Sequence, residues 1–231
     1  MFTPRRRRGT ELLDDPTIDP AIRARSITDV TRSNKLLGGL RAATATFEEI
    51  LPTLDDGATI VDVGTGLADI PLRVCELARA NHRTFTAIGV DEAWSLLHAD
   101  RSRLDAGVCA NALELPFRDH SVDVVMCSQI LHHFDDADAE RFLREMNRVA
   151  RRAVIVSDLR RSWIAAAGFW LVSFPLGFHR VTRHDGVVSV LRGFTASDLQ
   201  RLVKRATGIA PIVARRLGWR LTARWSPAHT E

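Results

Sequence analysis

Apolar residues along the chain alternate between short strand-like runs and longer segments with helical spacing. The run "TIVDV" at 59–63 precedes a helical pattern over 69–80, and "TAIGV" at 86–90 precedes one over 92–104. The runs "GVCA", "VDVVMCS" and "AVIVS" follow, with a helical pattern over 137–149 between the last two. This alternation predicts an α/β fold with a Rossmann-like, doubly wound sheet. Ligand-binding residues are then expected in the loops that follow the strands.

The two ends of the chain depart from this alternation. Residues 1–54 predict a tail and two capping helices broken at Gly38-Gly39, ahead of a main domain over 55–231. After the fifth strand, a helix over 195–206 and an antiparallel terminal hairpin around Gly218 bring the predicted sheet to seven strands.

An apolar stretch at 162–178 lies between the fifth strand and that last helix. It is short for a bilayer, and Ser173 and Pro175 interrupt it. We therefore predict a buried helix or, over about 160–192, a helical lid for a lipophilic substrate. A membrane surface, contacted peripherally, stays open as a possible partner of this stretch.

Composition places the chain among ordinary globular proteins, with 45% hydrophobic and 26% charged residues. The net charge of +4 comes almost wholly from arginine. The basic run at 5–8 has no apolar segment after it, which predicts a solvated, frayed N-terminus and no secretory signal. Three widely spaced cysteines read as buried free thiols without zinc spacing, which favours a reducing, cytoplasmic location.

A glycine loop after the first strand carries the clearest chemical signal. Gly64 and Gly66 in "VDVGTGLADIP" allow a tight turn before a helix, an arrangement typical of nucleotide-type ligands. Asp69 and Ile70 stand around the place of the third glycine of a dinucleotide loop. Asp62, at the end of the strand, would repel a pyrophosphate but can receive an ammonium group.

Asp91 ends the second strand in "AIGVDEA", where a carboxylate can accept hydrogen bonds from both ribose hydroxyls. A ligand with a ribose, no phosphate and a cationic amino-acid end is S-adenosylmethionine.

At these residues the chain resembles the class I S-adenosylmethionine-dependent methyltransferases. The resemblance covers roughly residues 55–160 and includes "ANALELPFRDHSVDVVMCSQILHHF", which is similar to the adenine-reading segment and fourth strand of the family. Asn111 departs from the family's usual Asp but retains an acceptor oxygen for the adenine amino group. We also expect the N-terminal helices to close over the cofactor, with Arg32 and Asn34 facing it. The expected cofactor-binding residues are Asp62, Gly64, Thr65, Gly66, Asp91, Glu92, Asn111, Ala112, Ser128 and Asn34.

The flanking segments resemble small stand-alone bacterial methyltransferases of quinones, aromatic polyketides and other lipophilic metabolites, which implies secondary metabolism. We expect an apolar acceptor cavity walled by aromatic residues of the stretch at 162–178, namely Trp163, Phe169, Trp170, Phe174 and Phe178. His184, beside Asp185, is the expected general base and His133 the second choice, with O-methylation slightly favoured. His184, Asp185 and Gly186 read equally well as a turn.

Several alternatives remain beside this interpretation. C- or N-methylation of another metabolite and a non-catalytic cofactor-binding module stay open. The absence of tyrosine and of the third glycine argues against a nicotinamide-dependent dehydrogenase. The fourth strand ends in "CSQI", without the Asn/Asp-Pro-Pro-aromatic segment typical of nucleic-acid amino-methyltransferases at this place, which argues against that class. His132, His133, Asp135 and Asp136 favour a helix cap over a metal site, so no metal is expected. The protein is expected to be a monomer or homodimer.

Overall fold

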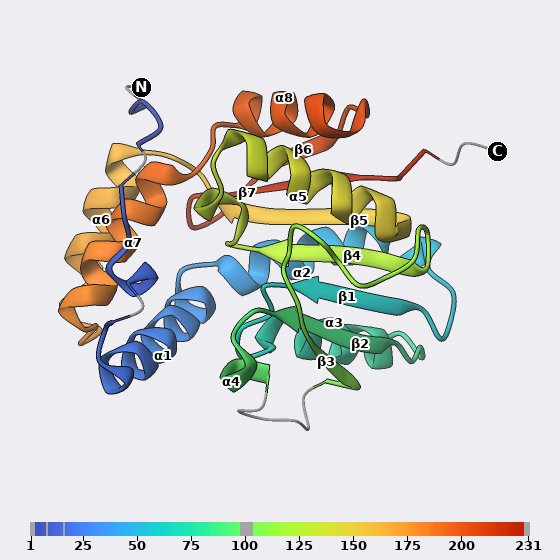
Figure 1. Cartoon of the computed structure of the whole chain (residues 1–231), viewed down its shortest axis with the longest axis horizontal. Helices are drawn as coiled ribbons and strands as arrows, with labels where there is room; N and C mark the ends of the chain where they lie inside the picture. The colour runs from blue at the N-terminus through green and yellow to red at the C-terminus, as the bar shows by residue number, and fades with distance from the viewer. Residues whose placement is uncertain (1–2, 8, 16, 98–103, 229–231) are drawn as a thin grey trace.

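A computed structural model describes residues 3–7, 9–15, 17–97 and 104–228 as one seven-stranded sheet covered by helices (Figure 1). The strands lie in the order β3-β2-β1-β4-β5-β7-β6. Their bounds are β1 Thr59–Val63, β2 Thr86–Asp91, β3 Ala106–Cys109, β4 Val122–Ser128, β5 Ala150–Leu159, β6 Ile212–Arg216 and β7 Arg220–Trp225. The helices are α1 Pro20–Leu36, α2 Gly39–Ile50, α3 Asp69–Ala80, α4 Trp94–Leu97, α5 Asp136–Val149, α6 Trp163–Ser173, α7 Arg180–Arg192 and α8 Ala196–Thr207.

The sheet confirms the predicted doubly wound architecture. β1 pairs in parallel with both β2 and β4, and the antiparallel β6–β7 hairpin closes the edge beside β5. The chain runs outward from β1 through β2 and β3, then returns to place β4 on the other side of β1. Such a switch point opens a crevice at the carboxyl ends of β1 and β4, where ligands bind in sheets of this type.

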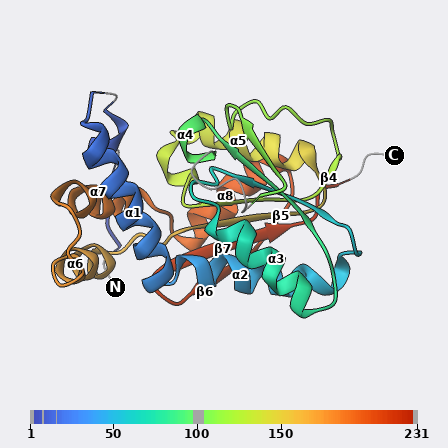
Figure 2. The ribbon, with the colours of Figure 1, turned by 90° about the horizontal axis from the view of Figure 1, so that it is seen from below.

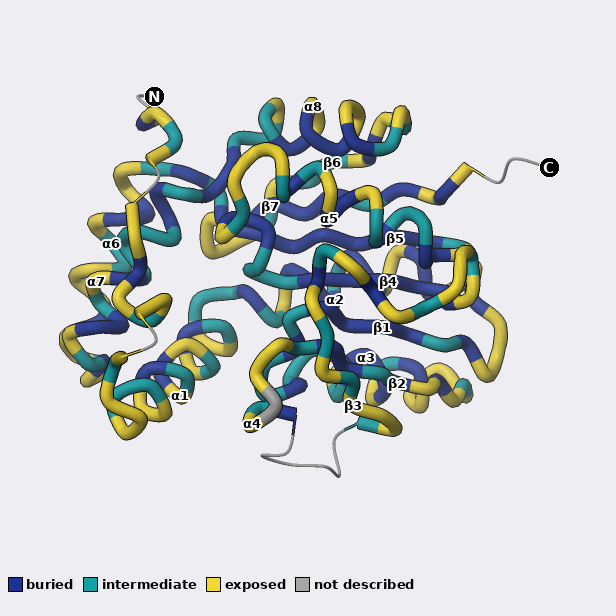
Figure 3. The backbone as a smooth tube through the Cα atoms, in the orientation of Figure 1, coloured by how far each residue is buried: buried dark blue, intermediate teal, exposed yellow. Residues whose placement is uncertain are grey.

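Helices cover both faces of the sheet, and Figure 2 shows α2 and α3 on one side and α5 and α8 on the other. Phe47 of α2 packs with Ile60 and Val74 on the first side, and Phe142 of α5 packs with Leu199 of α8 on the second. The central strands are consequently buried along most of their length (Figure 3). Their continuous apolar runs reflect a sheet covered on both faces.

Helices α1, α6 and α7 form a further layer beyond the carboxyl ends of the parallel strands (Figure 1). The predicted turn at 184–186 is wrong, because these residues lie inside α7. A Cβ on Gly186 would lie 2.0 Å from the ring of Phe169, so this glycine permits close packing of α7 on α6. Helix-on-helix approach therefore explains a glycine that the sequence suggested for a turn.

The described part of the N-terminal segment is not frayed, which corrects the prediction for the arginine run. The Arg6 Nε donates to the carbonyl of Arg192 at 2.8 Å, and the guanidinium lies 4.4 Å from the ring centroid of Phe194. The amides of Leu12 and Leu13 donate to the two carboxylate oxygens of Asp185 at 2.8 and 2.9 Å. These contacts hold the segment against α7.

Two smaller expectations also change. The helix predicted over 92–104 is seen at Trp94–Leu97, and residues 98–103 lie outside the described part of the chain. Cys75 and Cys127 are buried free thiols as predicted, whereas Cys109 is exposed. Within the described ranges, we find no helix with the length and apolar character needed to cross a membrane.

Candidate active site

A glycine turn joins β1 to α3 at the carboxyl edge of the sheet. Gly64 has a φ of +71°, and a Cβ there would lie 2.7 Å from the Cδ1 of Ile130. The amides of Gly64 and Thr65 donate to the carbonyl of Val90 at 2.8 and 3.1 Å, which ties the turn to the end of β2. Conformation and space therefore both require glycine at position 64.

Two carboxylates flank this turn. Asp62 is only 1% exposed, and its Oδ1 has no hydrogen-bond partner among the described residues. Burial raises the pKa of Asp62 to about 7; the charge of Asp91 acts in the same direction and the Thr65 hydroxyl opposes both. The Asp91 Oδ2 accepts from the amide of Gly66 at 3.0 Å, and its Oδ1 accepts from the amide of Ala93 at 2.9 Å.

A cavity of about 930 Å³ lies over the carboxyl edge, and all ten residues expected to bind the cofactor border it. Asp62, Gly64, Thr65, Gly66 and Ser128 come from β1, β4 and the turn. The others are Asp91, Glu92, Asn111, Ala112 and, from α1, Asn34.

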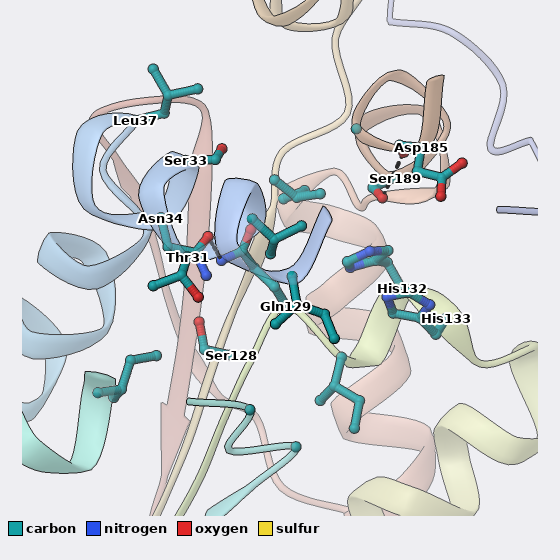
Figure 4. A pocket seen from close by; sticks show the side chains of 18 of the residues that line it. Thr31, Ser33, Asn34, Leu37, Ser128, Gln129, His132, His133, Asp185 and Ser189 are labelled. Atoms are coloured by element: carbon teal, nitrogen blue, oxygen red, sulfur yellow. Dashed lines mark hydrogen bonds between the residues drawn. The ribbon is translucent and has the colours of Figure 1, made fainter. Parts of the chain in front are cut away.

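Two of these side chains already have partners within the protein. Asn111 Oδ1 accepts from the amide of Leu113 at 2.8 Å and keeps a second lone pair. Asn34 Oδ1 accepts from the side-chain amide of Gln129 (Figure 4). Arg32, expected to face the cofactor with Asn34, instead lies 3.8 Å from Asp29 and does not border the cavity.

The other end of the cavity is bounded by α1, α6 and α7, where the apolar side chains of α6 face a mixed lining that includes Thr182 and Ser189 of α7. Of the five aromatic residues expected to wall it, only Phe169 borders the cavity. Trp163, Trp170 and Phe174 are exposed, and Phe178 is buried without bordering the cavity. The helix α6 instead presents Ile164, Ala165, Gly168, Phe169 and Val172 to the cavity. These positions recur with helical spacing and leave the tryptophans on the outer face.

His132 borders the cavity from the 3-10 turn Leu131–His133, which follows β4. It is 3% exposed, and its Nδ1 lies 2.7 Å from Asp158 Oδ1. Asp158 also accepts from the amides of His132 and Leu159, at 3.1 and 2.6 Å. Burial acts to raise the pKa of Asp158, but His132 and the Leu159 amide outweigh it and keep that pKa below its ordinary value.

An ionised Asp158 assigns the proton of His132 to Nδ1. The Nε2 of His132 is then an acceptor, and it is buried without a hydrogen-bond partner in the described part of the chain. A buried Asp, an imidazole and a free ring nitrogen at a cavity wall form a base that a neighbouring carboxylate orients. His132 was not predicted as a base from the sequence, where the pair His132-His133 was weighed as a metal site and only His133 as a second choice for the base.

Glu11 reaches the same place from the N-terminal segment. Its Oε1 accepts from the Ser189 hydroxyl at 2.8 Å and from Arg192 at 3.3 Å, and it lies 3.9 Å from His132 Nε2. Burial raises the pKa of Glu11, against the opposing effects of His132, Ser189 and Arg192. No local pattern in the sequence could connect Glu11 with a histidine so far along the chain.

Glu11, His132 and His133 offer ligand atoms that all lie within 4.8 Å of one another and could hold a metal ion. The guanidinium of Arg192 already neutralises the carboxylate that such an ion would need. Burial, His132 and Arg192 lower the pKa of His133 to about 3, although 36% of its side-chain surface is accessible. Figure 4 shows the two imidazoles side by side, facing Asp185 and Ser189 of α7.

His184, the first choice for the base, lies outside the residues that border the cavity. Its Nδ1 lies 2.8 Å from Asp185 Oδ1, as the adjacency of the two residues suggested, but the side chain is half exposed. Asp185 holds the amides of Leu12 and Leu13, so this pair secures the N-terminal segment.

Comparison with known proteins places the site in context. Residues 61–156 match the profile of a family described as a methyltransferase domain. A methyltransferase from Aquifex aeolicus, described as S-adenosylmethionine-dependent, has a similar fold, with a TM-score of 0.58 and 14% identity over 92% of this chain and 100% of that one. Magnesium protoporphyrin IX methyltransferase (ChlM) from Synechocystis PCC 6803, solved with S-adenosylhomocysteine, gives a TM-score of 0.52 and 13% identity over 93% and 90%.

A third similar structure is the pyocyanin biosynthetic protein PhzM, with a TM-score of 0.57 and 18% identity. That match covers 81% of this chain but only 55% of PhzM, so the chain spans about half the length of that protein. Identities this low show a shared fold and leave the acceptor to be argued from the cavity.

Proposed function

We propose that the chain is a class I S-adenosylmethionine-dependent methyltransferase and that it methylates a hydroxyl group of an apolar, aromatic small molecule. The observation that carries this proposal is the meeting of an apolar chamber with the free Nε2 of a carboxylate-oriented histidine, His132. In this proposal residues 1–54 cap the cavity and 160–192 form the substrate lid of a main domain over 55–231.

The residues around the glycine turn fit the cofactor. Asp62 offers a buried oxygen without a partner, which suits an ammonium group, and Asp91 offers a carboxylate beside the turn for ribose hydroxyls. The backbone at Gly66 faces open space, which leaves room for close approach of a ligand, and Ser128 adds a buried hydroxyl without a partner among the described residues. When bound, the cofactor supplies a methyl group on a sulfonium, which is an activated leaving group.

The remaining work of this chain is to position the acceptor and exclude water. The apolar side chains of α6, with Ile27 and Val30 of α1 and Val190 of α7, line the acceptor end, and this apolar share of the lining favours an uncharged aromatic molecule. Holding two reactants in line is the main source of rate enhancement when the leaving group is already activated.

A phenol or other hydroxyl gains nucleophilicity by losing its proton, and His132 Nε2 is placed to accept it. Asp158 is a positioning residue that orients the imidazole and stabilises its cation after proton transfer. His133 is a weaker choice because its pKa of about 3 disfavours the protonated form near neutral pH. His184 stays a hypothesis that the same experiment tests.

The test is turnover with a series of alkylated phenols and hydroquinones, comparing His132→Gln with His184→Gln. We expect His132→Gln to lower kcat by about 10²-fold or more with S-adenosylhomocysteine affinity nearly unchanged, and His184→Gln to retain turnover. Asp158→Asn should lower kcat and alter its pH profile, which a purely structural role would not do. Full turnover of His132→Gln would refute the base, and loss confined to His184→Gln would return that role to His184.

A further inference from the structure

Exposed apolar side chains gather around the mouth of the cavity. They come from three segments that are distant in sequence: α1, α6 and the β6–β7 turn. Leu36, Ile164 and Leu217, one from each segment, are both exposed and in contact with the cavity. Apolar side chains that line the cavity are thus also exposed on the outer surface in each of these three segments.

Helix α6 contributes most to this surface. Its sequence, "WIAAAGFWLVS", contains no charged residue, yet Ile164, Trp170 and Leu171 are 58%, 49% and 60% exposed. Figure 1 places α6 at the outer side of the molecule, away from the sheet. A helix this apolar would ordinarily be covered, so its exposure marks an interaction surface.

Positive charge surrounds the apolar surface. The guanidinium groups of Arg7 and Arg183 lie 4.9 and 4.4 Å from the ring centroids of Trp163 and Phe174. The acidic residues within α1, α6 and α7 are Asp29 and Asp185, and both are buried. The exposed charged side chains of these three helices are therefore basic, whereas two exposed acidic residues, Asp14 and Glu92, border the cavity from other segments.

We propose that this face docks on an anionic phospholipid surface, with α6 lying in the headgroup region and the cavity mouth open toward the lipid. Exposed tryptophans beside arginines suit that interface, where aromatic rings and aliphatic side chains enter the lipid and cations meet phosphates. The delivery of a membrane-dissolved acceptor into the cavity rests on the proposed function, whereas the docking itself does not.

The test measures co-sedimentation with vesicles of phosphatidylcholine alone and of phosphatidylcholine with phosphatidylglycerol. The variant is Trp170→Ala with Leu171→Ala, because neither side chain borders the cavity. The matched control is Ile212→Ala, which removes an exposed apolar side chain from the edge strand β6. Melting temperature and S-adenosylhomocysteine affinity show that each variant is folded.

We expect the unaltered protein to bind anionic vesicles more tightly than neutral ones, and less tightly as salt is raised. The double variant should lose about tenfold or more of its partition coefficient, and Ile212→Ala should lose none. Turnover should fall in the double variant only when the acceptor is embedded in vesicles.

Absence of vesicle binding, or equal binding by the double variant, would overturn the docking proposal. A concentration-dependent dimer that the double variant abolishes, without vesicle binding, would assign the face to a second copy and also overturn it. The docking proposal would also be overturned if the double variant lost turnover selectively on an acceptor that is tethered to an acidic carrier protein. Vesicle binding without turnover on any hydroxylated acceptor would uphold docking while the proposed function failed.

Discussion

Proton uptake by Asp62 should make cofactor affinity depend on pH. Asp62 is fully buried beside the glycine turn, and its pKa is raised to about 7, so near neutral pH half of the free protein carries a protonated carboxyl. An ammonium group binds well only to the carboxylate form. Binding should therefore release a proton below pH 7 and strengthen as the pH rises toward 8.5.

The size of the effect follows from the pKa. At pH 5.5, about 1.5 units below it, affinity should be about 30-fold weaker than on the plateau at pH 8.5, or ~2 kcal/mol. Asp91 contributes to the raised pKa through its charge. Asp91→Asn should therefore move the midpoint to lower pH while weakening binding at every pH.

Titration calorimetry with S-adenosylhomocysteine, in two buffers of different protonation enthalpy, measures both the affinity and the protons released. Methylthioadenosine, which lacks the amino-acid end, is the matched ligand and should bind with little pH dependence. Asp62→Asn should bind weakly with a flat profile. The reasoning is refuted if the unaltered protein shows the same affinity at pH 5.5 and 8.5, or if methylthioadenosine shows the same slope.

Three further outcomes are expected. Because the pKa of Asp62 is raised on folding, its contribution to stability is fully present below about pH 4 and is lost as the pH rises through about 7. At pH 8, Asp62→Asn should thus raise the unfolding free energy of the cofactor-free protein by up to about 4 kcal/mol, which a thermal scan detects as a higher melting temperature. Chelation should leave turnover unchanged because Arg192 already neutralises Glu11, and a loss restored by a divalent ion would instead assign a metal to Glu11, His132 and His133. Gly186→Ala would place a Cβ 2.0 Å from the Phe169 ring and separate α6 from α7, so KM for an apolar acceptor should rise several-fold with S-adenosylhomocysteine affinity kept; an unchanged KM would show that the lid adjusts.

The sheet was predictable because each strand and helix carries its own local signal. The apolar runs of β1, β4 and β5 are continuous because both faces of these strands are covered, and the helical spacing of α3 and α5 follows their buried stripes. The course of α7 was not predictable, because "HDG" carries turn residues and only the packing of Phe169 against Gly186 selects a helix. Tertiary contact outweighed local propensity there.

The cofactor end and the acceptor end of the cavity also differ in how far the sequence predicts them. The residues expected at the cofactor end follow consecutive strands, so topology alone brings them to one cavity. The acceptor end depends on which face each added helix presents and on long-range contacts such as Glu11 with Ser189. Nothing in the spacing of α6 distinguishes a face turned to the cavity from one turned outward, and the aromatic residues chosen from sequence were mostly on the outer one.

The distribution of unsatisfied polar atoms connects this fold to its function. Seven buried side-chain polar atoms in the described part of the chain lack a partner, and all but Ser26 Oγ lie near the carboxyl edge of the parallel strands. The six are Asp62 Oδ1, Thr65 Oγ1, Ser128 Oγ, His132 Nε2, Ser157 Oγ and Arg220 Nε. Each such atom costs about 1–3 kcal/mol when nothing satisfies it, so together they weaken the ligand-free protein at one place. Ligands that supply the missing hydrogen bonds regain part of that free energy on binding, and affinity for a polar cofactor therefore arises from the same buried groups that limit stability without it.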